Sequence, residues 1–265
     1  MRKTAFLLAL CLILTLLLTA CYMPSAEIEY AISEDGSHAV VTGIGSSAKG
    51  RVVIADTYEG KYVTEIAEGA FAGSGIGSVY MTPNMREIGK RAFAGCKSLT
   101  ALNIPAYLTR IGEEAFDGCE SLAMLTFEDI PQLRVIGDGA FRGCIGLRDL
   151  ILPSGVTAIG KEAFAGCTAL EILTVGTSLS TVGDRAFADC TALRQMSFPA
   201  TLTSLGCGAF TGCTALTAVS FEDPYAWYMA ESTSVIGGTP IDLQYANLNA
   251  ERLTGEHLAY AFKRH

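Results

Sequence analysis

The nine residues IGKEAFAGC at positions 159–167 decide the fold, because the same words return along the chain, for example as IGEEAFDGC at 111–119. Their central phenylalanine recurs in steps of 22, 23, 25, 23, 23 and 23 residues, at Phe71, Phe93, Phe116, Phe141, Phe164, Phe187 and Phe210. Seven copies in register at this period are typical of a repeat array in which each copy is one structural unit. The sequence therefore predicts a solenoid.

A second pattern, L-x-x-L-x-Φ with Φ a large apolar residue, follows each copy. The apolar positions of three successive copies are Leu99, Leu102 and Ile104, then Leu122, Leu125 and Phe127, then Leu147, Leu150 and Leu152. The last three positions alternate between apolar and variable residues, which predicts a short half-buried strand. Pro105, Pro153 and Pro199 follow directly and are expected to end the strand.

The other half of each repeat, I-G-x-x-A-F, places its apolar residues at helix-like spacing. The run is too short for a stable α-helix, so we expect a single helical or 3₁₀ turn. The x-x positions are charged, as in Lys90-Arg91, Glu113-Glu114, Lys161-Glu162 and Asp184-Arg185, and form a solvated outer face. The predicted fold class is therefore an α/β repeat solenoid with short parallel strands and short helical turns.

A single repeat cannot bury its own apolar side, so neighbouring coils must cover one another and both ends need caps. The two alternating stretches at 28–32 and 40–41, separated by EDGS at 34–37, predict a hairpin within an N-terminal cap over 27–62. We assign the repeats to 63–222 and a C-terminal cap to 223–265, where the repeat pattern ends.

The N-terminus has the features of a secretion signal. Arg2 and Lys3 precede an apolar segment at 5–18, which ends in LTAC at 18–21. Small residues before a cysteine resemble the lipobox of bacterial lipoproteins, so we expect a signal peptide at 1–20, lipid on Cys21 and a tether at 21–26. An ordinary signal with a chance cysteine, or an uncleaved anchor, remains an alternative. The predicted location is the bacterial cell envelope or cell surface.

Composition limits the partners. The formal net charge is −8, with 19 Lys and Arg against 27 Asp and Glu, so the chain lacks the basic field that nucleic acid would require. No segment after the N-terminus has the 18 uninterrupted apolar residues of a membrane span. We therefore expect no nucleic-acid partner and membrane association only through the N-terminal lipid.

Six cysteines lie three residues after the repeat phenylalanine: Cys96, Cys119, Cys144, Cys167, Cys190 and Cys213. An exported protein with many cysteines invites a disulfide framework. However, side chains in register on successive coils point in parallel, whereas a disulfide needs converging Cβ atoms. We therefore expect this cysteine ladder to consist of buried thiols, with no zinc site because nearby histidines are missing. Cys207 stands outside the ladder.

The residues offer little support for catalysis. His38, His257 and His265 lie in the caps, away from any recurring nucleophile and acid. The sequence SSAK at 46–49 has an S-x-x-K spacing, but so short a motif is expected by chance. Glu113, Glu114, Asp117 and Glu120 are acidic, but a solvated face explains them better than a cation site. We expect no enzyme, no catalytic residue, no metal and no cofactor.

The recurring words I-G-x-x-A-F-x-G-C-x-x-L-x-x-L-x-I-P resemble the BspA-type bacterial leucine-rich repeats. The stretches at 52–54 and 63–66 are similar to the way those arrays begin, and the resemblance covers roughly residues 30 to 245. It implies a right-handed horseshoe-like solenoid on the surface of a bacterium, often a host-associated anaerobe, with a role in adhesion or in binding host proteins. Family membership does not name the ligand.

Strand alternation locates the expected binding face, since residues flanking the second inward position must point outward. Two columns result: Ser78, Ala101, Met124, Asp149, Ile172, Gln195 and Ala218, and Tyr80, Asn103, Thr126, Ile151, Thr174, Ser197 and Ser220. They contain one charge, and β-propensity alone is an alternative reason for their composition. We predict that a protein or glycan ligand contacts the concave face at Tyr80, Met124, Thr126, Ile151, Ile172 and Thr174. The alternative function is a structural spacer of the envelope.

Overall fold

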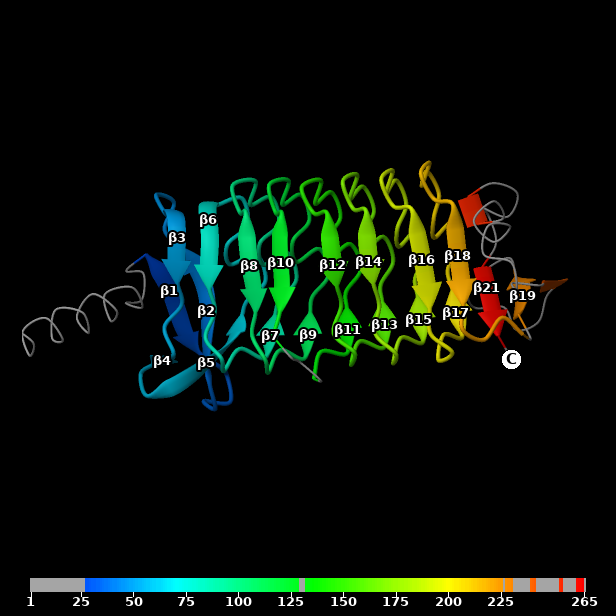
Figure 1. Cartoon of the computed structure of the whole chain (residues 1–265). Coiled ribbons are helices and arrows are strands. Elements are labelled where there is room, and N and C mark those ends of the chain that lie inside the picture. Colours follow the sequence, from blue (N-terminus) through cyan, green and yellow to red (C-terminus); the bar gives the residue numbers. More distant parts are fainter. Residues whose placement is uncertain are drawn as a thin grey trace, which may run out of the picture.

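The computed structural model describes residues 27–128, 132–225, 227–230, 239–241, 253–254 and 261–264. Within these residues the chain winds into stacked coils that follow one another with little change of direction (Figure 1). The signal peptide, Cys21 and the tether, all expected at 1–26, lie outside the described residues. None of the described helical segments is long and apolar enough to cross a bilayer.

One face of the coils carries the strands that the L-x-x-L-x-Φ pattern predicts. They are β6 (Gly75–Tyr80), β8 (Ala101–Ile104), β10 (Met124–Phe127), β12 (Asp149–Ile151), β14 (Ile172–Thr174), β16 (Gln195–Phe198) and β18 (Ala218–Phe221), and β3 (Lys49–Val53), which lies before the pattern begins, joins them on the same face. All pairings between them are parallel. They form two four-stranded sheets, ordered β10-β8-β6-β3 and β12-β14-β16-β18. The parallel repeat solenoid is therefore confirmed.

The opposite face is also built of strands. Two-residue strands begin the I-G-x-x-A-F half of the six later copies: β7 (Glu87–Ile88), β9 (Arg110–Ile111), β11 (Val135–Ile136), β13 (Ala158–Ile159), β15 (Thr181–Val182) and β17 (Ser204–Leu205). They pair in parallel within one 13-stranded sheet. Because both faces share the spacing of strand ladders, about 4.8 Å, neither face is forced to be longer than the other. This explains why the stack curves so little.

The helical turn expected at I-G-x-x-A-F does not form. The second x residue has a left-handed backbone, with φ of 54° at Arg91, 52° at Glu114, 55° at Glu162 and 54° at Arg185. A right-handed helical turn cannot contain such a residue. Each turn instead bonds to the next coil, as in Phe93 N–H to Ala115 O at 2.7 Å. Among the described residues the helical content of the predicted class is almost absent.

The glycine after each strand of this face is required by the close approach of coils. A Cβ atom added to Gly112 would lie 2.7 Å from the carbonyl carbon of Gly89 in the preceding coil. No larger residue fits at that distance without moving backbone. The recurrent Ile-Gly pair is therefore a packing signature: the isoleucine fills the core and the glycine lets the next coil stack.

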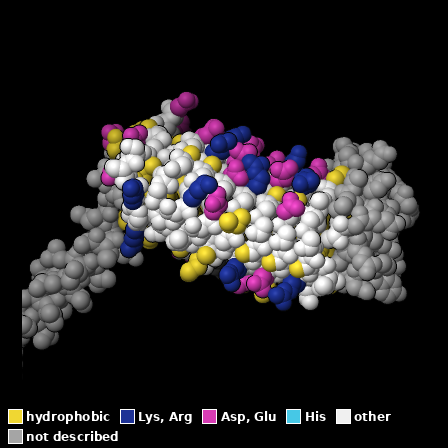
Figure 2. All heavy atoms as spheres, turned by 90° about the horizontal axis from the view of Figure 1, so that it is seen from above, with side chains coloured by type: hydrophobic (Ala, Val, Ile, Leu, Met, Phe, Trp, Pro, Cys, Tyr) yellow, Lys and Arg dark blue, Asp and Glu magenta, His cyan; other side chains and the backbone are white. Residues whose placement is uncertain are grey.

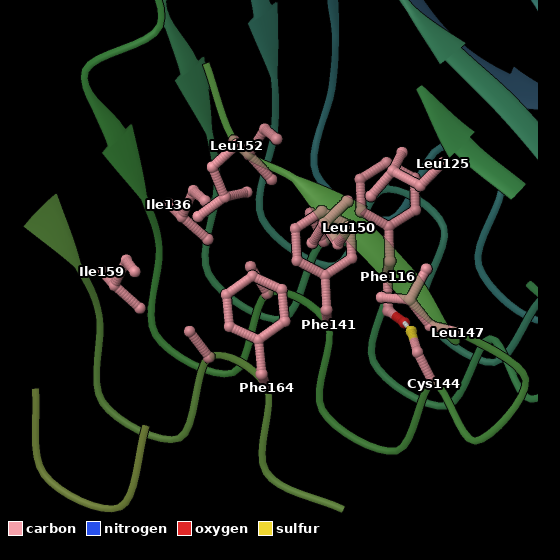
Figure 3. Close-up of a cluster of buried hydrophobic side chains, with 14 of the residues drawn as sticks. Phe116, Leu125, Ile136, Phe141, Cys144, Leu147, Leu150, Leu152, Ile159 and Phe164 are labelled. Atoms are coloured by element: carbon pink, nitrogen blue, oxygen red, sulfur yellow. Dashed lines mark hydrogen bonds between the residues drawn. The ribbon is translucent and has the colours of Figure 1, made fainter. Parts of the chain in front are cut away.

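The seven repeat phenylalanines form one stack through the core. Neighbouring ring centroids are 4.9 to 5.9 Å apart, and their planes differ by at most 22°. All seven rings are fully buried. Figure 3 shows Phe116, Phe141 and Phe164 in this stack, with Leu150 beside them. Offset aromatic pairs add to the free energy gained from burial, so the stack stabilises the packing of each coil on the next. The predicted core is confirmed.

The cysteine ladder runs beside the phenylalanine stack. Each Sγ–H donates to the main-chain carbonyl of the phenylalanine one coil earlier, at 3.0 to 3.3 Å. All six side chains are buried, and every described cysteine is a free thiol. Burial raises the pKa of the Cys119 and Cys167 thiols to about 12. The register thus gives each thiol a hydrogen-bond partner of its own.

Both ends of the described stack change topology. At the N-terminal end, β1 (Ile28–Ile32) and β2 (Ala39–Ile44) form the antiparallel hairpin that alternation predicts. Strand β2 then pairs in parallel with β5 (Lys61–Ile66), to which β4 (Thr57–Tyr58) adds in antiparallel fashion. At the other end, β21 (Ala261–Arg264) pairs antiparallel with β17 and with β19 (Trp227–Ala230), which pairs with β20 (Thr239–Ile241).

Candidate binding face

The outward residues of β6, β8, β10, β12, β14, β16 and β18 form a continuous surface, which we call the strand face. Every position of the two predicted columns is half-buried or exposed, whereas the alternate positions Val79, Leu102, Leu125, Leu150, Leu173, Met196 and Val219 are buried. The inward and outward assignment made from alternation is therefore correct for all seven strands.

Large apolar side chains are exposed at the middle of this face. Ile151 is 72% exposed, Met124 64% and Ile172 58%, which makes Ile151 the most exposed large hydrophobic residue of the described part. Ile172 is in register with Asp149 and Gln195, and Ile151 with Thr174. The three side chains come from consecutive coils, and we call them together the apolar ridge, defined as Met124, Ile151 and Ile172.

The strand ladder is interrupted beneath this ridge. Strands β10 and β12 come from consecutive coils, but the described residues form no ladder between them. The interruption coincides with the repeat of 25 residues, in which Phe127 is followed by Ile136 after nine residues, whereas Leu152 is followed by Ile159 after seven. The connection after β10 is thus two residues longer than the one after β12, and residues 129–131 within it lie outside the described part. We call the interruption the seam.

Two depressions adjoin the ridge. The smaller one, about 250 Å³, lies over β6, β8 and β10, and its lining includes Arg51, Tyr80, Asn103, Met124 and Thr126. The larger one, about 650 Å³, lies along the seam, and we call it the seam groove. Its lining residues are Leu125, Thr126, Phe127, Glu128, Asp149, Ile151, Leu152, Pro153, Ser154, Thr174, Val175, Gly176 and Thr177. Thr126 lines both depressions.

Hydrogen bonds fix the polar side chains between the depressions. Thr126 Oγ1 donates to Asn103 Oδ1 at 2.9 Å, and Asn103 Nδ2 donates to Glu128 Oε1 at 3.2 Å. The three residues thus hold one another in place across β8 and β10. A surface whose polar groups are already ordered loses less side-chain entropy when it meets a ligand.

The six predicted ligand residues all lie on the strand face, and the structure brings five of them into the two depressions. Tyr80 and Met124 line the smaller one, Ile151 and Thr174 line the seam groove, and Thr126 lines both. Ile172 lies beside them on the ridge. The sequence analysis did not predict the lining residues that follow the strands, which are Glu128, Pro153, Ser154, Val175 and Thr177. The 25-residue step was the signal that marked this place.

Charged side chains gather elsewhere, on the turns. Figure 2 shows Lys, Arg, Asp and Glu side by side in a band along one long edge of the described part. Successive coils pair across this band, as in Lys90 with Glu113 at 2.7 Å and Arg91 with Glu114 at 3.0 Å. Arg142 contacts Glu114, Asp117 and Glu162 within 3.4 Å, and Asp117, followed by Glu114, raises the pKa of its guanidinium.

The acidic group noted in the sequence is therefore neutralised by its neighbours. Glu113 pairs with Lys90, Glu114 and Asp117 pair with Arg142, and Glu120 pairs with Lys97 at 2.7 Å. The candidate histidine His38 lies 3.4 Å from Glu65 and accepts or donates a 2.9 Å bond with Ser37. None of these contacts assembles a nucleophile with a base and an acid.

Stacked parallel coils, each with an L-x-x-L-x-Φ strand on the same face, are the architecture of a leucine-rich-repeat solenoid. Residues 57–144 and 128–227 match the BspA type leucine rich repeat region, in six copies. These ranges span more than half of the chain, which therefore belongs to the BspA-type leucine-rich-repeat family. No curated protein matches the chain by sequence. No catalytic family is indicated.

Solved structures share the fold. A leucine rich repeat protein of T. pallidum is 29% identical, with 73% of this chain and 90% of that chain covered and a TM-score of 0.63. A leucine rich cell surface protein from Faecalibacterium prausnitzii is 24% identical, with 84% and 61% covered and a TM-score of 0.66. A leucine-rich repeat protein from Eubacterium ventriosum is 22% identical, with 69% and 51% covered and a TM-score of 0.58.

Proposed function

We propose that this protein is a surface-anchored binding or adhesion protein that recognises a protein or glycan ligand on its strand face. The single observation that carries the proposal is the exposure of the apolar ridge, with Ile151 at 72%. Exposed apolar residues that gather in one place mark interaction sites, because a solvated surface gains nothing from them. β-Propensity alone favours isoleucine on any strand, but it does not place three apolar residues on consecutive coils beside two depressions.

The contrast between the two sides of the array supports the same proposal. The turns are covered by ion pairs that already satisfy one another between coils. Such pairs contribute little to a new interface because they would have to be desolvated. The strand face has one charge among its fourteen column residues, so a ligand can cover it at a lower cost.

The proposed location is the bacterial surface, with lipid on Cys21 as the anchor. Support comes from the charged, apolar and LTAC segments of the N-terminus and from membership of the BspA-type family. The similar protein from F. prausnitzii is described as a leucine rich cell surface protein. Anchored in this way, the solenoid presents its strand face to the surroundings of the cell.

A binding screen tests the proposal. Residues 27–265, immobilised through a C-terminal tag, are exposed to an array of host matrix proteins and of glycans, with an unrelated repeat protein as the control surface. We expect saturable capture of at least one ligand by this chain and not by the control. Absence of saturable capture from both arrays would favour the structural spacer instead.

A further inference from the structure

The seam groove has a lining that combines two chemistries. Its apolar part is formed by Ile151, Leu152, Pro153 and Val175, next to Phe127. Its charged part consists of carboxylates alone, since Glu128 and Asp149 are the sole ionisable groups among the thirteen lining residues. Both carboxylate residues are exposed, and neither forms an ion pair with a described residue. On the turns, by contrast, Glu113, Glu114, Asp117 and Glu120 all have cationic partners.

Nearby cations do not enter the groove. Arg148 precedes Asp149 in the chain, and Arg134 donates to Gly155 O at 3.1 Å, but neither side chain lines the groove. The groove is therefore anionic in a chain whose net charge is already −8. Carboxylates inside a concave apolar surface favour a cation from the partner, and the charge of the whole chain attracts a basic partner over a longer range.

The interrupted ladder adds a third feature. Strands β10 and β12 pair on their outer edges with β8 and β14 but form no ladder with each other. The main-chain N–H and C=O groups on the facing sides of β10 and β12 therefore do not form the ladder hydrogen bonds that join β8 to β10. The seam places one carboxylate on each side of the groove, Glu128 directly after β10 and Asp149 at the start of β12.

We propose that the seam groove binds a protein segment in which a basic side chain, Lys or Arg, stands next to a large apolar side chain. The apolar side chain packs on Ile151 and Val175, and the cation meets Glu128 and Asp149. A neutral glycan supplies neither the cation nor the aliphatic group. This inference rests on the proposed function and narrows its ligand to the protein class.

A displayed library of random dodecapeptides tests the inference. Residues 27–265 select binders after counter-selection on the Ile151→Lys variant. We expect recovered peptides to be enriched in Lys or Arg beside Leu, Ile, Phe or Trp and depleted in Asp and Glu. Enrichment without a basic residue, or recovery of acidic peptides, would overturn the inference. So would a library that yields no binder.

A charge-neutral variant pair supplies the matched control. Glu128→Gln with Asp149→Asn removes both groove carboxylates, and Glu87→Gln with Glu113→Gln removes two exposed carboxylates on the other side of the array. The first pair should weaken a recovered peptide about fivefold, as expected for exposed charge contacts, and the second should leave it unchanged. Equal weakening by both pairs would show mere long-range attraction and would contradict the inference. If a glycan from the screen binds the strand face while no peptide does, the proposed function stands and this inference fails.

Discussion

The thiol of Cys144 donates a hydrogen bond to the main-chain carbonyl of Phe116, one coil earlier, over 3.3 Å. Figure 3 shows this bond at the base of the phenylalanine stack. The same carbonyl also accepts the N–H of Cys119 in its own coil at 3.1 Å, so it serves both coils. One residue type thereby meets two requirements of the array: it fills a small apolar space and satisfies a buried carbonyl.

Alkylation should separate the ladder from Cys207. In the native protein near pH 8, iodoacetamide should modify Cys207 first, because Cys207 is half-buried whereas all six ladder thiols are buried. After denaturation without reductant, mass spectrometry should count the ladder cysteines as free thiols. Three intact bridges among the six would contradict the ladder.

Stability should fall at alkaline pH because of the buried thiols. Burial raises the pKa of Cys119 and Cys167 from 9.0 to about 12, so the folded state holds protons that the unfolded state releases. The stabilisation is complete below pH 9 and is lost as pH rises toward 12, by about 1.4 kcal/mol per thiol and pH unit. In denaturant titrations at pH 8, 9 and 10, the free energy of unfolding should fall less with pH for the double variant Cys119→Ser with Cys167→Ser than for the parent. An identical pH dependence in parent and variant would mean that these thiols do not titrate as buried groups.

Phe164 should be a major source of stability. Its ring lies 5.3 Å from Phe141 and 5.9 Å from Phe187, so its removal leaves a cavity between two coils. We expect Phe164→Ala to lower the free energy of unfolding by about 3–5 kcal/mol. Because repeats are coupled to their neighbours, one shared transition should move to lower denaturant. A thermal melt within about 1 °C of the parent would refute the stack as the stabilising core.

The lipid anchor is tested in a bacterial host. Cys21→Ser should abolish acylation, so the mature protein should leave the membrane fraction. Phase partitioning in detergent and intact mass report this directly. A Cys207→Ser variant controls for the loss of any cysteine, and it should fractionate like the parent. Retention and processing of Cys21→Ser as in the parent would show that Cys21 is not the anchor.

Much of the fold follows from the sequence, because the same pattern occurs in every repeat and each copy supports the assignment made for the others. The seven phenylalanines and the L-x-x-L-x-Φ strands were predicted correctly, since stacking requires the same residue in the same place on every coil. The prediction of a helical turn at I-G-x-x-A-F was wrong, because the spacing of apolar residues there does not distinguish a helical turn from a short strand followed by a left-handed residue. Arg91 and Glu114 are not glycines, yet both have positive φ, and the type of side chain does not predict this backbone conformation.

The candidate site was predicted in part, for a related reason. Alternation placed Ile151 and Thr174 outward, and they line the seam groove as exposed residues. The groove itself depends on a mismatch between two coils, which no single repeat contains. Its carboxylate Glu128 follows a strand rather than occupying a column, so alternation did not include it. The two-residue excess between Phe127 and Ile136 carried that information.

The measurement that tests the strand face most directly compares two double variants with the parent in binding to a ligand captured in the screen. Ile151→Lys with Ile172→Lys places charges on the apolar ridge, whereas Val135→Lys with Thr181→Lys places the same charges on exposed residues of the opposite face. Circular dichroism should show all three proteins equally folded. The ridge variant should bind at least about tenfold more weakly, and the opposite-face variant within about twofold of the parent. A folded ridge variant that binds like the parent would contradict the account, and the strand face would then be a neutral sheet.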